Sequence, residues 1–119
     1  MLTFYNSKGN AIAYISDDNQ SIYLYNGIPV AWLSENNIFA YNGRYLGWIE
    51  KGWVFDRKGN RVFFTENATG GPVKPVKSVK PIRGVRGVRP VKGVREVKPV
   101  RPVRSLSWSN ISNEDYFKQ

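Results

Sequence analysis

The sequence contains no cysteine and no histidine. Without cysteine there is no disulfide, no thiolate nucleophile and no zinc–thiolate site. Without histidine, the commonest metal ligand and the commonest general base near neutral pH are also missing. The remaining residues show no paired carboxylates, catalytic triad, phosphate-binding loop or metal-ligand spacing. The sequence therefore predicts a protein that is not an enzyme and that holds neither a cofactor nor a metal ion.

Long apolar runs are missing too. No stretch approaches the length of apolar residues that spans a bilayer. The first ten residues, MLTFYNSKGN, lack the charged and apolar regions of a secretory signal. Both absences favour a cytoplasmic location and argue against a transmembrane segment.

Excess charge is confined to one part of the chain. Residues 1–72 carry six Lys/Arg and six Asp/Glu, so their formal charge is zero. Residues 73–105 carry eleven Lys/Arg and one glutamate, a formal charge of +10, and the last fourteen residues carry −1. This division, together with the repeats described below, predicts a β domain over residues 1–70, a low-complexity basic segment over 71–105 and a C-terminal segment over 106–119.

The first part contains a repeat of about sixteen residues. A glycine recurs at spacings of 18, 16 and 16 residues, each followed three positions later by an aliphatic residue and five positions later by an aromatic residue. The glycines are Gly9, Gly27, Gly43 and Gly59, and the aromatic residues are Tyr14, Trp32, Trp48 and Phe64. The flanking runs are rich in Val, Ile and aromatic residues and alternate in polarity, as short strands do.

These repeats predict an all-β fold of four hairpins. Asn26-Gly27 and Asn42-Gly43 favour type I′ turns, in which both central residues have positive φ. Because a single hairpin is marginal in water, four copies are expected to close around a pseudo-fourfold axis. The repeated aromatic residues would then meet in a ring or central layer, as core or as a ligand-binding pocket. Other tyrosines near the turns are expected to be more exposed: Tyr25, Tyr41 and Tyr45.

Hairpins of this length with N-G turns, followed by the closing segment LSWSNISNEDYF, resemble the bacterial fourfold β-flower family. The resemblance covers residues 1–69 and 106–117, and it implies a fold but no activity. The stretch from Trp48 to Gly59 is more loosely similar to choline- and glucan-binding cell-wall repeats. Those repeats normally run nearer twenty residues and follow a signal peptide, which counts against them.

The basic segment repeats every three residues. Each triplet places a valine or isoleucine first and a lysine or arginine second, from Val73 to Ser105. Five prolines exclude an α-helix, and the scarcity of glycine excludes a collagen helix. Polyproline II has three residues per turn and would align the cations along one edge. The cations are Lys74, Lys77, Lys80, Arg83, Arg86, Arg89, Lys92, Arg95, Lys98, Arg101 and Arg104.

Several interpretations of this segment stay open. The segment could be a solvated linker or a ligand for a proline-reading domain. Its valine edge could pack on the β domain. It could also contact nucleic acid or another polyanion without sequence specificity. The last interpretation makes the protein a non-catalytic interaction or scaffold protein. The alternatives are a carbohydrate- or small-ligand-binding module that uses Trp32 and Trp48, a purely structural domain in a larger assembly, and a mobile-element cargo protein whose partner is another protein.

The C-terminal residues return to apolar chemistry. Trp108, Ile111 and Phe117 have no core of their own, so we expect the segment to pack back on the β domain. Ser112 and Asp115 have the spacing of a capped short helix.

Overall fold

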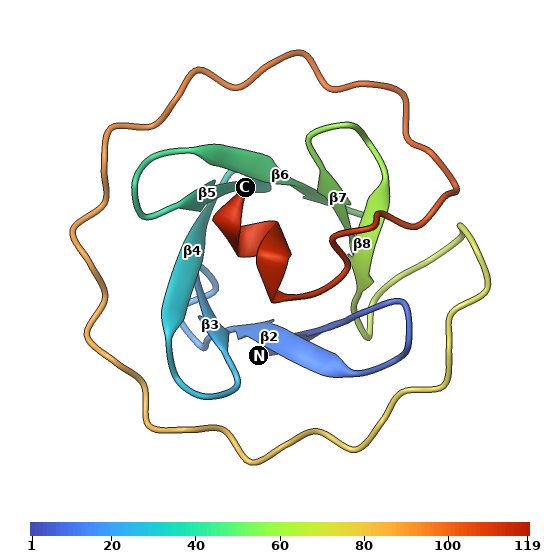
Figure 1. Ribbon diagram of the computed structural model, residues 1–119, viewed down its shortest axis with the longest axis horizontal. Helices are drawn as coiled ribbons and strands as arrows, with labels where there is room; N and C mark the ends of the chain where they lie inside the picture. The colour runs from blue at the N-terminus through green and yellow to red at the C-terminus, as the bar shows by residue number, and fades with distance from the viewer.

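A computed structural model describes all 119 residues as a flat disc of 37 × 36 × 22 Å. Eight antiparallel strands follow one another around a closed barrel, and β8 pairs back to β1 (Figure 1). The all-β prediction is confirmed. The strands are β1 Leu2–Tyr5, β2 Ala11–Ile15, β3 Ser21–Leu24, β4 Pro29–Ser34, β5 Asn37–Ala40, β6 Tyr45–Glu50, β7 Trp53–Asp56 and β8 Arg61–Phe64.

Small residues allow the barrel to close tightly. Within each hairpin, one fully buried residue of the first strand faces a buried residue of the second, and that second residue is Ala13, Ala31 or Gly47 in three of the four hairpins. The fourth hairpin has Phe63 instead. Its ring stacks on Phe4 with centroids 5.6 Å apart. A narrow barrel has room for such a bulky side chain from one repeat but not from all four.

The repeated aromatic residues do not meet on the axis, and that prediction was wrong. Side chains alternate between the two sides of a strand, so a residue that follows an inward alanine points outward. Each aromatic residue stacks on the outer wall against its partner on the paired strand. The four stacked pairs are Tyr14–Tyr23, Trp32–Phe39, Trp48–Phe55 and Tyr5–Phe64.

The type I′ prediction for the Asn-Gly turns was also wrong. Asn26 does not have a positive φ, while Gly27 has a φ of 95° and donates its N–H to the carbonyl of Leu24 at 2.9 Å. The Asn26 side chain accepts the N–H of Ile28, which stabilises this different turn. Two consecutive residues of positive φ occur at the opposite end of the strands, at Glu35 and Asn36.

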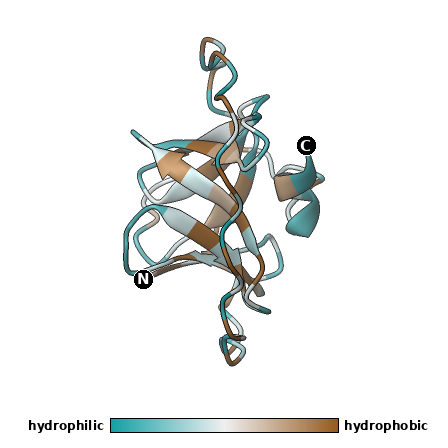
Figure 2. Ribbon diagram, turned by 90° about the vertical axis from the view of Figure 1, so that its left-hand side faces the viewer, coloured by the Kyte–Doolittle hydropathy of each residue, from teal (hydrophilic) through white to brown (hydrophobic).

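The C-terminal segment lies against one face of the disc, where η1 (Glu114–Lys118) is visible on the right of Figure 2. Tyr116 is fully buried and donates its hydroxyl to the carbonyl of Phe55 at 2.9 Å. The cap of η1 is Asn113, not Ser112; the Ser112 hydroxyl instead donates to the carbonyl of Val62. η1 is the only helix, and it lacks the length and apolar character needed to cross a membrane.

We expect Tyr116→Phe to lower the free energy of unfolding by about 1–2 kcal/mol, because the Phe55 carbonyl loses its buried donor. Urea unfolding of the two proteins measures the difference. Phe117→Leu, which removes no hydrogen bond, is the matched control for disturbance of the same segment. Unchanged stability of Tyr116→Phe would contradict the importance of this contact.

Candidate functional site: the basic belt

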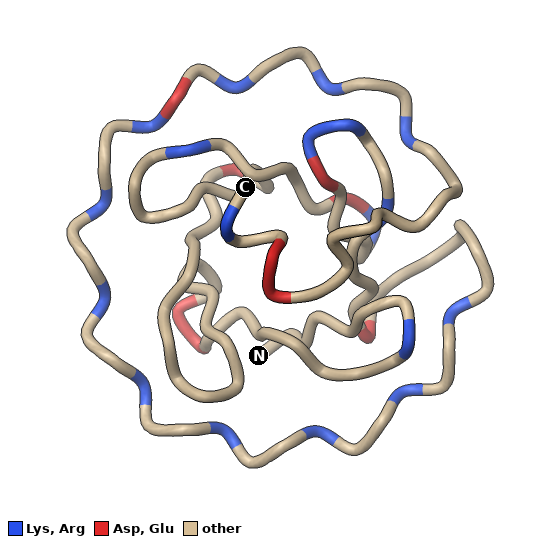
Figure 3. Tube along the Cα trace, viewed as in Figure 1, with Lys and Arg blue, Asp and Glu red and all other residues tan.

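Residues 73–105, here called the belt, run around the outside of the barrel past the tips of all four hairpins (Figures 1 and 3). Every ninth residue of the belt donates its backbone N–H to the carbonyl of one turn glycine. One nine-residue unit, or three triplets, therefore corresponds to one hairpin. The bonds are Ser78 to Gly9 (2.8 Å), Gly87 to Gly27 (2.9 Å), Glu96 to Gly43 (2.8 Å) and Ser105 to Gly59 (2.9 Å).

The turn glycines are required for a second reason. A Cβ atom on Gly27 would lie 2.0 Å from the carbonyl oxygen of Val85, and one on Gly43 would lie 1.9 Å from that of Val94. Both glycines also have positive φ. A glycine at this position therefore forms the turn and leaves the space that the belt backbone occupies.

The nine-residue period is visible in the sequence, although the triplet pattern obscures it. Prolines recur nine residues apart at Pro72, Pro81, Pro90 and Pro99. The third residue of each unit is Pro75, Gly84, Gly93 or Pro102, and each of the two glycines donates its N–H to a tyrosine carbonyl of a hairpin. A search for a longer period within the triplets would have linked the belt to the four hairpins.

The two sides of the belt differ sharply. All eleven valine and isoleucine side chains face outward, each 91–97% exposed. The proposal that a valine edge packs on the β domain was therefore wrong. Because the aliphatic side chains face outward, the cation of each triplet is directed toward the barrel wall.

Every unit places at least one cation beside an aromatic ring of the outer wall, and two units place two there. Arg83 and Arg86 lie over the ring of Tyr14, with guanidinium carbons 5.4 and 5.6 Å from its centroid. Lys92 and Arg95 cover the next pair, Trp32 and Phe39, at 5.4 and 5.6 Å. Further around, Arg101 lies 5.3 Å from Trp48 and Lys77 lies 5.7 Å from Tyr5. Lys74 donates instead to the carbonyl of Ala68.

The cations over Tyr14, Trp32 and Trp48, and the rings of Tyr5, Trp53 and Trp108 around Phe64, explain the burial of the candidate aromatic residues. Tyr14, Trp32, Trp48 and Phe64 are only 0–3% exposed, so they offer no open face to a sugar ring. The tyrosines expected to be exposed are affected as well. Tyr25 and Tyr45 are buried, and Tyr41 is half-buried, because the belt and the neighbouring rings lie over them.

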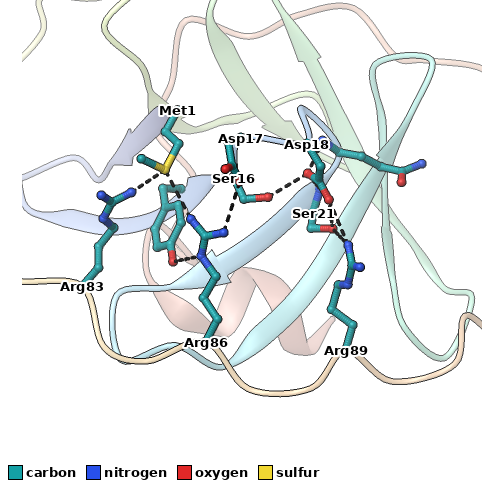
Figure 4. A network of polar contacts seen from close by, with 10 residues as sticks. Met1, Ser16, Asp17, Asp18, Ser21, Arg83, Arg86 and Arg89 are labelled. Atoms are coloured by element: carbon teal, nitrogen blue, oxygen red, sulfur yellow. Dashed lines mark hydrogen bonds and ion pairs between the residues drawn. The ribbon is translucent and has the colours of Figure 1, made fainter.

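Four belt cations pair with carboxylates. Arg86 approaches Asp17 at 3.2 Å and Arg89 approaches Asp18 at 2.9 Å in the network of Figure 4, where Arg83 also contacts Met1. The other two pairs are Lys80–Glu66 (2.9 Å) and Arg104–Glu50 (3.3 Å). The remaining seven cations have no carboxylate partner. They are Lys74, Lys77, Arg83, Lys92, Arg95, Lys98 and Arg101.

Asp18 is the most strongly perturbed carboxylate of this network. Its burial alone would raise its pKa, but hydrogen bonds from the Ser21 hydroxyl and N–H, the Ser16 hydroxyl and the Gln20 N–H outweigh burial and hold the pKa far below its usual value. Glu66 behaves similarly, because hydrogen bonds from Lys80 and Thr3 overcome the effect of burial and lower its pKa. Both carboxylates therefore stay ionised beside the belt at neutral pH.

A closed barrel of four hairpin petals, encircled by its own basic belt, places this chain among the all-β proteins built from internal repeats. The sequence matches the family described as 4-fold beta flower protein over residues 2–117, and the chain belongs to that family. The matched range includes the belt, which the resemblance noted from the repeats had left out. No curated protein and no solved structure matches the chain.

Gly43→Ala tests the contact between turn and belt. The added methyl group meets both a positive φ and the belt carbonyl, so we expect a loss of unfolding free energy well above the ~1 kcal/mol of a strained backbone alone. Gly70→Ala is the control, since Gly70 has a φ of 68° and no neighbouring atom within 4 Å of its Cβ position. Equal losses in urea unfolding would show that the belt does not press on the turn.

The lowered pKa of Asp18 also predicts a pH dependence. The folded-state pKa lies below the unfolded value of about 3.9, so the stabilisation is complete above that value and is lost as the pH falls toward the lower folded-state pKa. Asp18→Asn should therefore be less stable than the native chain at pH 7, and the gap should shrink below about pH 4. A gap that stays constant in denaturant titrations from neutral to acid pH would contradict this role.

Proposed function

We propose that the protein is a non-catalytic interaction protein whose belt contacts a polyanion such as a nucleic acid backbone. The observation that carries this proposal is the surplus of cations. Seven of the eleven Lys/Arg of the belt have no carboxylate partner, and those that do remain partly exposed. The barrel itself contributes no net charge, so the positive potential is concentrated along the circumference.

A regular, extended belt supports this function. The environment of the side chains repeats every three residues, as expected for a polyproline II-like conformation with three residues per turn. At about 3.1 Å per residue the 33 residues would extend about 100 Å, close to the ~110 Å perimeter of a circle 36 Å across. The belt would thus be taut, with its cations at fixed intervals.

The C-terminal segment supports a rigid scaffold in the same proposal. Its contacts with the carbonyls of Phe55, Val62 and Leu46 would close one end of the barrel and anchor the chain beyond the belt. The N-terminal end of the belt starts beside the same hairpin, where Trp53 donates to the carbonyl of Thr69. Anchoring at both ends lowers the entropic cost of presenting many cations at once.

The mode of binding follows from the covered rings. Because the outer aromatic pairs are buried beneath the cations, base stacking contributes little and the phosphate backbone is the contact. Such binding releases counterions, is independent of sequence and weakens steeply with salt. The outward-facing valine and isoleucine side chains of the belt contribute no charge to this binding.

Replacing Lys77, Lys92 and Lys98 by glutamine tests this proposal. None of the three has a carboxylate partner, and the net charge falls from +9 to +6. We expect affinity for a labelled duplex DNA of arbitrary sequence to drop at least about tenfold, and the slope of log K against log salt to fall by up to about 3. Fluorescence anisotropy between about 50 and 200 mM salt measures both quantities.

The matched control replaces Lys8, Lys51 and Lys118, which lie outside the belt and give the same net charge. This control should retain most of the affinity. Equal losses of affinity in the two variants would show that binding depends only on the overall charge of the protein. Affinity of the native chain that does not change with salt concentration would contradict a polyanion contact. Circular dichroism melting of both variants checks that the fold is kept.

A further inference from the structure

A recess lies between the third and fourth hairpin turns and the C-terminal segment that carries η1. The third hairpin contributes Arg44, the fourth contributes Arg57, Lys58 and Asn60, and the C-terminal segment contributes Trp108 and Asn110. No residue of the belt lines this recess.

The side chains of this recess are mostly hydrogen-bond donors without protein partners. The side chains of Arg44, Lys58, Asn60 and Asn110 form no hydrogen bond or ion pair within the chain. The indole N–H of Trp108 has no partner either, whereas those of Trp48 and Trp53 do. A ligand with several acceptor oxygens would satisfy these groups together.

The acidic groups nearby are already engaged. Asp56 is buried and accepts the N–H groups of Lys58 and Asn60 within its turn. Glu96 of the belt lies 3.5 Å from Arg57, and the two side chains are 41% and 33% exposed. An exposed pair at that distance is weak. Arg44 and Lys58 thus form no ion pair with an acid, and the ion pair of Arg57 is weak.

The third hairpin differs from the others at one position that lines the recess. Arg44 directly follows its turn glycine, where the other hairpins have Asn10, Ile28 and Asn60. Lys58 directly precedes its turn glycine, as Lys8 does in the first hairpin, whereas the second and third hairpins have Asn26 and Asn42. Only the junction of the third and fourth hairpins therefore combines a cation after one turn glycine with a cation before the next.

Trp108 adds a flat surface to this junction. It packs edge-on against Trp53 with centroids 5.6 Å apart and is half-buried, whereas the other three tryptophans are buried. Its indole ring can stack on a planar group while the cations hold an anion beside it.

We infer that this recess binds a phosphate ester carried on a planar aromatic group, of which a nucleoside monophosphate is the simplest example. Arg44 and Lys58 hold the phosphate, Trp108 stacks on the base, and the amides of Asn60 and Asn110 bond to the sugar or base edge. The phosphate could belong to a free nucleotide or to the end of a nucleic acid strand, and both present the same chemistry.

Adenosine 5′-monophosphate is the probe. We expect saturable binding by calorimetry and a change in tryptophan fluorescence, because Trp108 is the one tryptophan that is not fully buried. Arg44→Gln with Lys58→Gln should weaken binding at least about tenfold. The charge-matched control, Lys8→Gln with Lys51→Gln, should bind as the native chain does. Adenosine, which lacks the phosphate, should bind at least about tenfold more weakly.

The outcomes separate this site from the belt. The Lys77, Lys92 and Lys98 variant should keep its affinity for adenosine 5′-monophosphate even where it loses the duplex. Absence of saturable binding by the native chain, or equal affinity in the Arg44/Lys58 variant, would overturn the inference. A 5′-phosphorylated oligonucleotide that binds more tightly than both its unphosphorylated form and the mononucleotide would assign the site to strand ends; tighter binding of the mononucleotide would assign it to free nucleotides.

Discussion

The close approach between the belt and the turn glycines governs the rest of the structure. At each turn a belt carbonyl occupies the space of a missing Cβ, and a belt N–H two residues later donates to the glycine carbonyl. This pairing fixes one nine-residue unit to each hairpin. With the backbone fixed in this way, the aliphatic residue of each triplet faces solvent and the cation faces the wall.

The belt covers a second apolar layer, which is made of the aromatic pairs on the outside of the small barrel. Strands of four to six residues enclose little interior volume, and the aliphatic core is correspondingly narrow. Outside it, stacked aromatic pairs form clusters around Trp48 and Tyr14 that the cations and their alkyl stems cover. Each cation–π contact contributes about 0.5–1 kcal/mol at such partly exposed sites, and their number makes the sum considerable. The basic segment is thus part of the folded structure as well as its most charged surface.

The sequence predicts the hairpin repeat and the all-β class because glycine spacing and polarity alternation are local properties. It also places the belt cations in one segment, because the three-residue repeat is evident in the sequence. It does not locate Trp32 or Trp48 on the outer wall, because alternation states that neighbouring residues point to opposite sides and not which side is the interior. Ala31 and Gly47 hold that information, since only small residues fit a narrow axis. The recess at Arg44 and Trp108 joins residues far apart in the chain, and no local pattern reports it.

The belt can bind all four hairpins only when the barrel is closed. Its acceptors on Gly9, Gly27, Gly43 and Gly59 come into a single ring only after β8 has paired with β1. A chain with an unfinished barrel would leave 33 residues, rich in arginine and lysine, extended and open to proteases. Incomplete molecules would thus expose the segment most easily degraded, and finished molecules would conceal the inner edge of that segment against their own wall. The exposure of the belt to proteases would therefore depend on closure of the barrel.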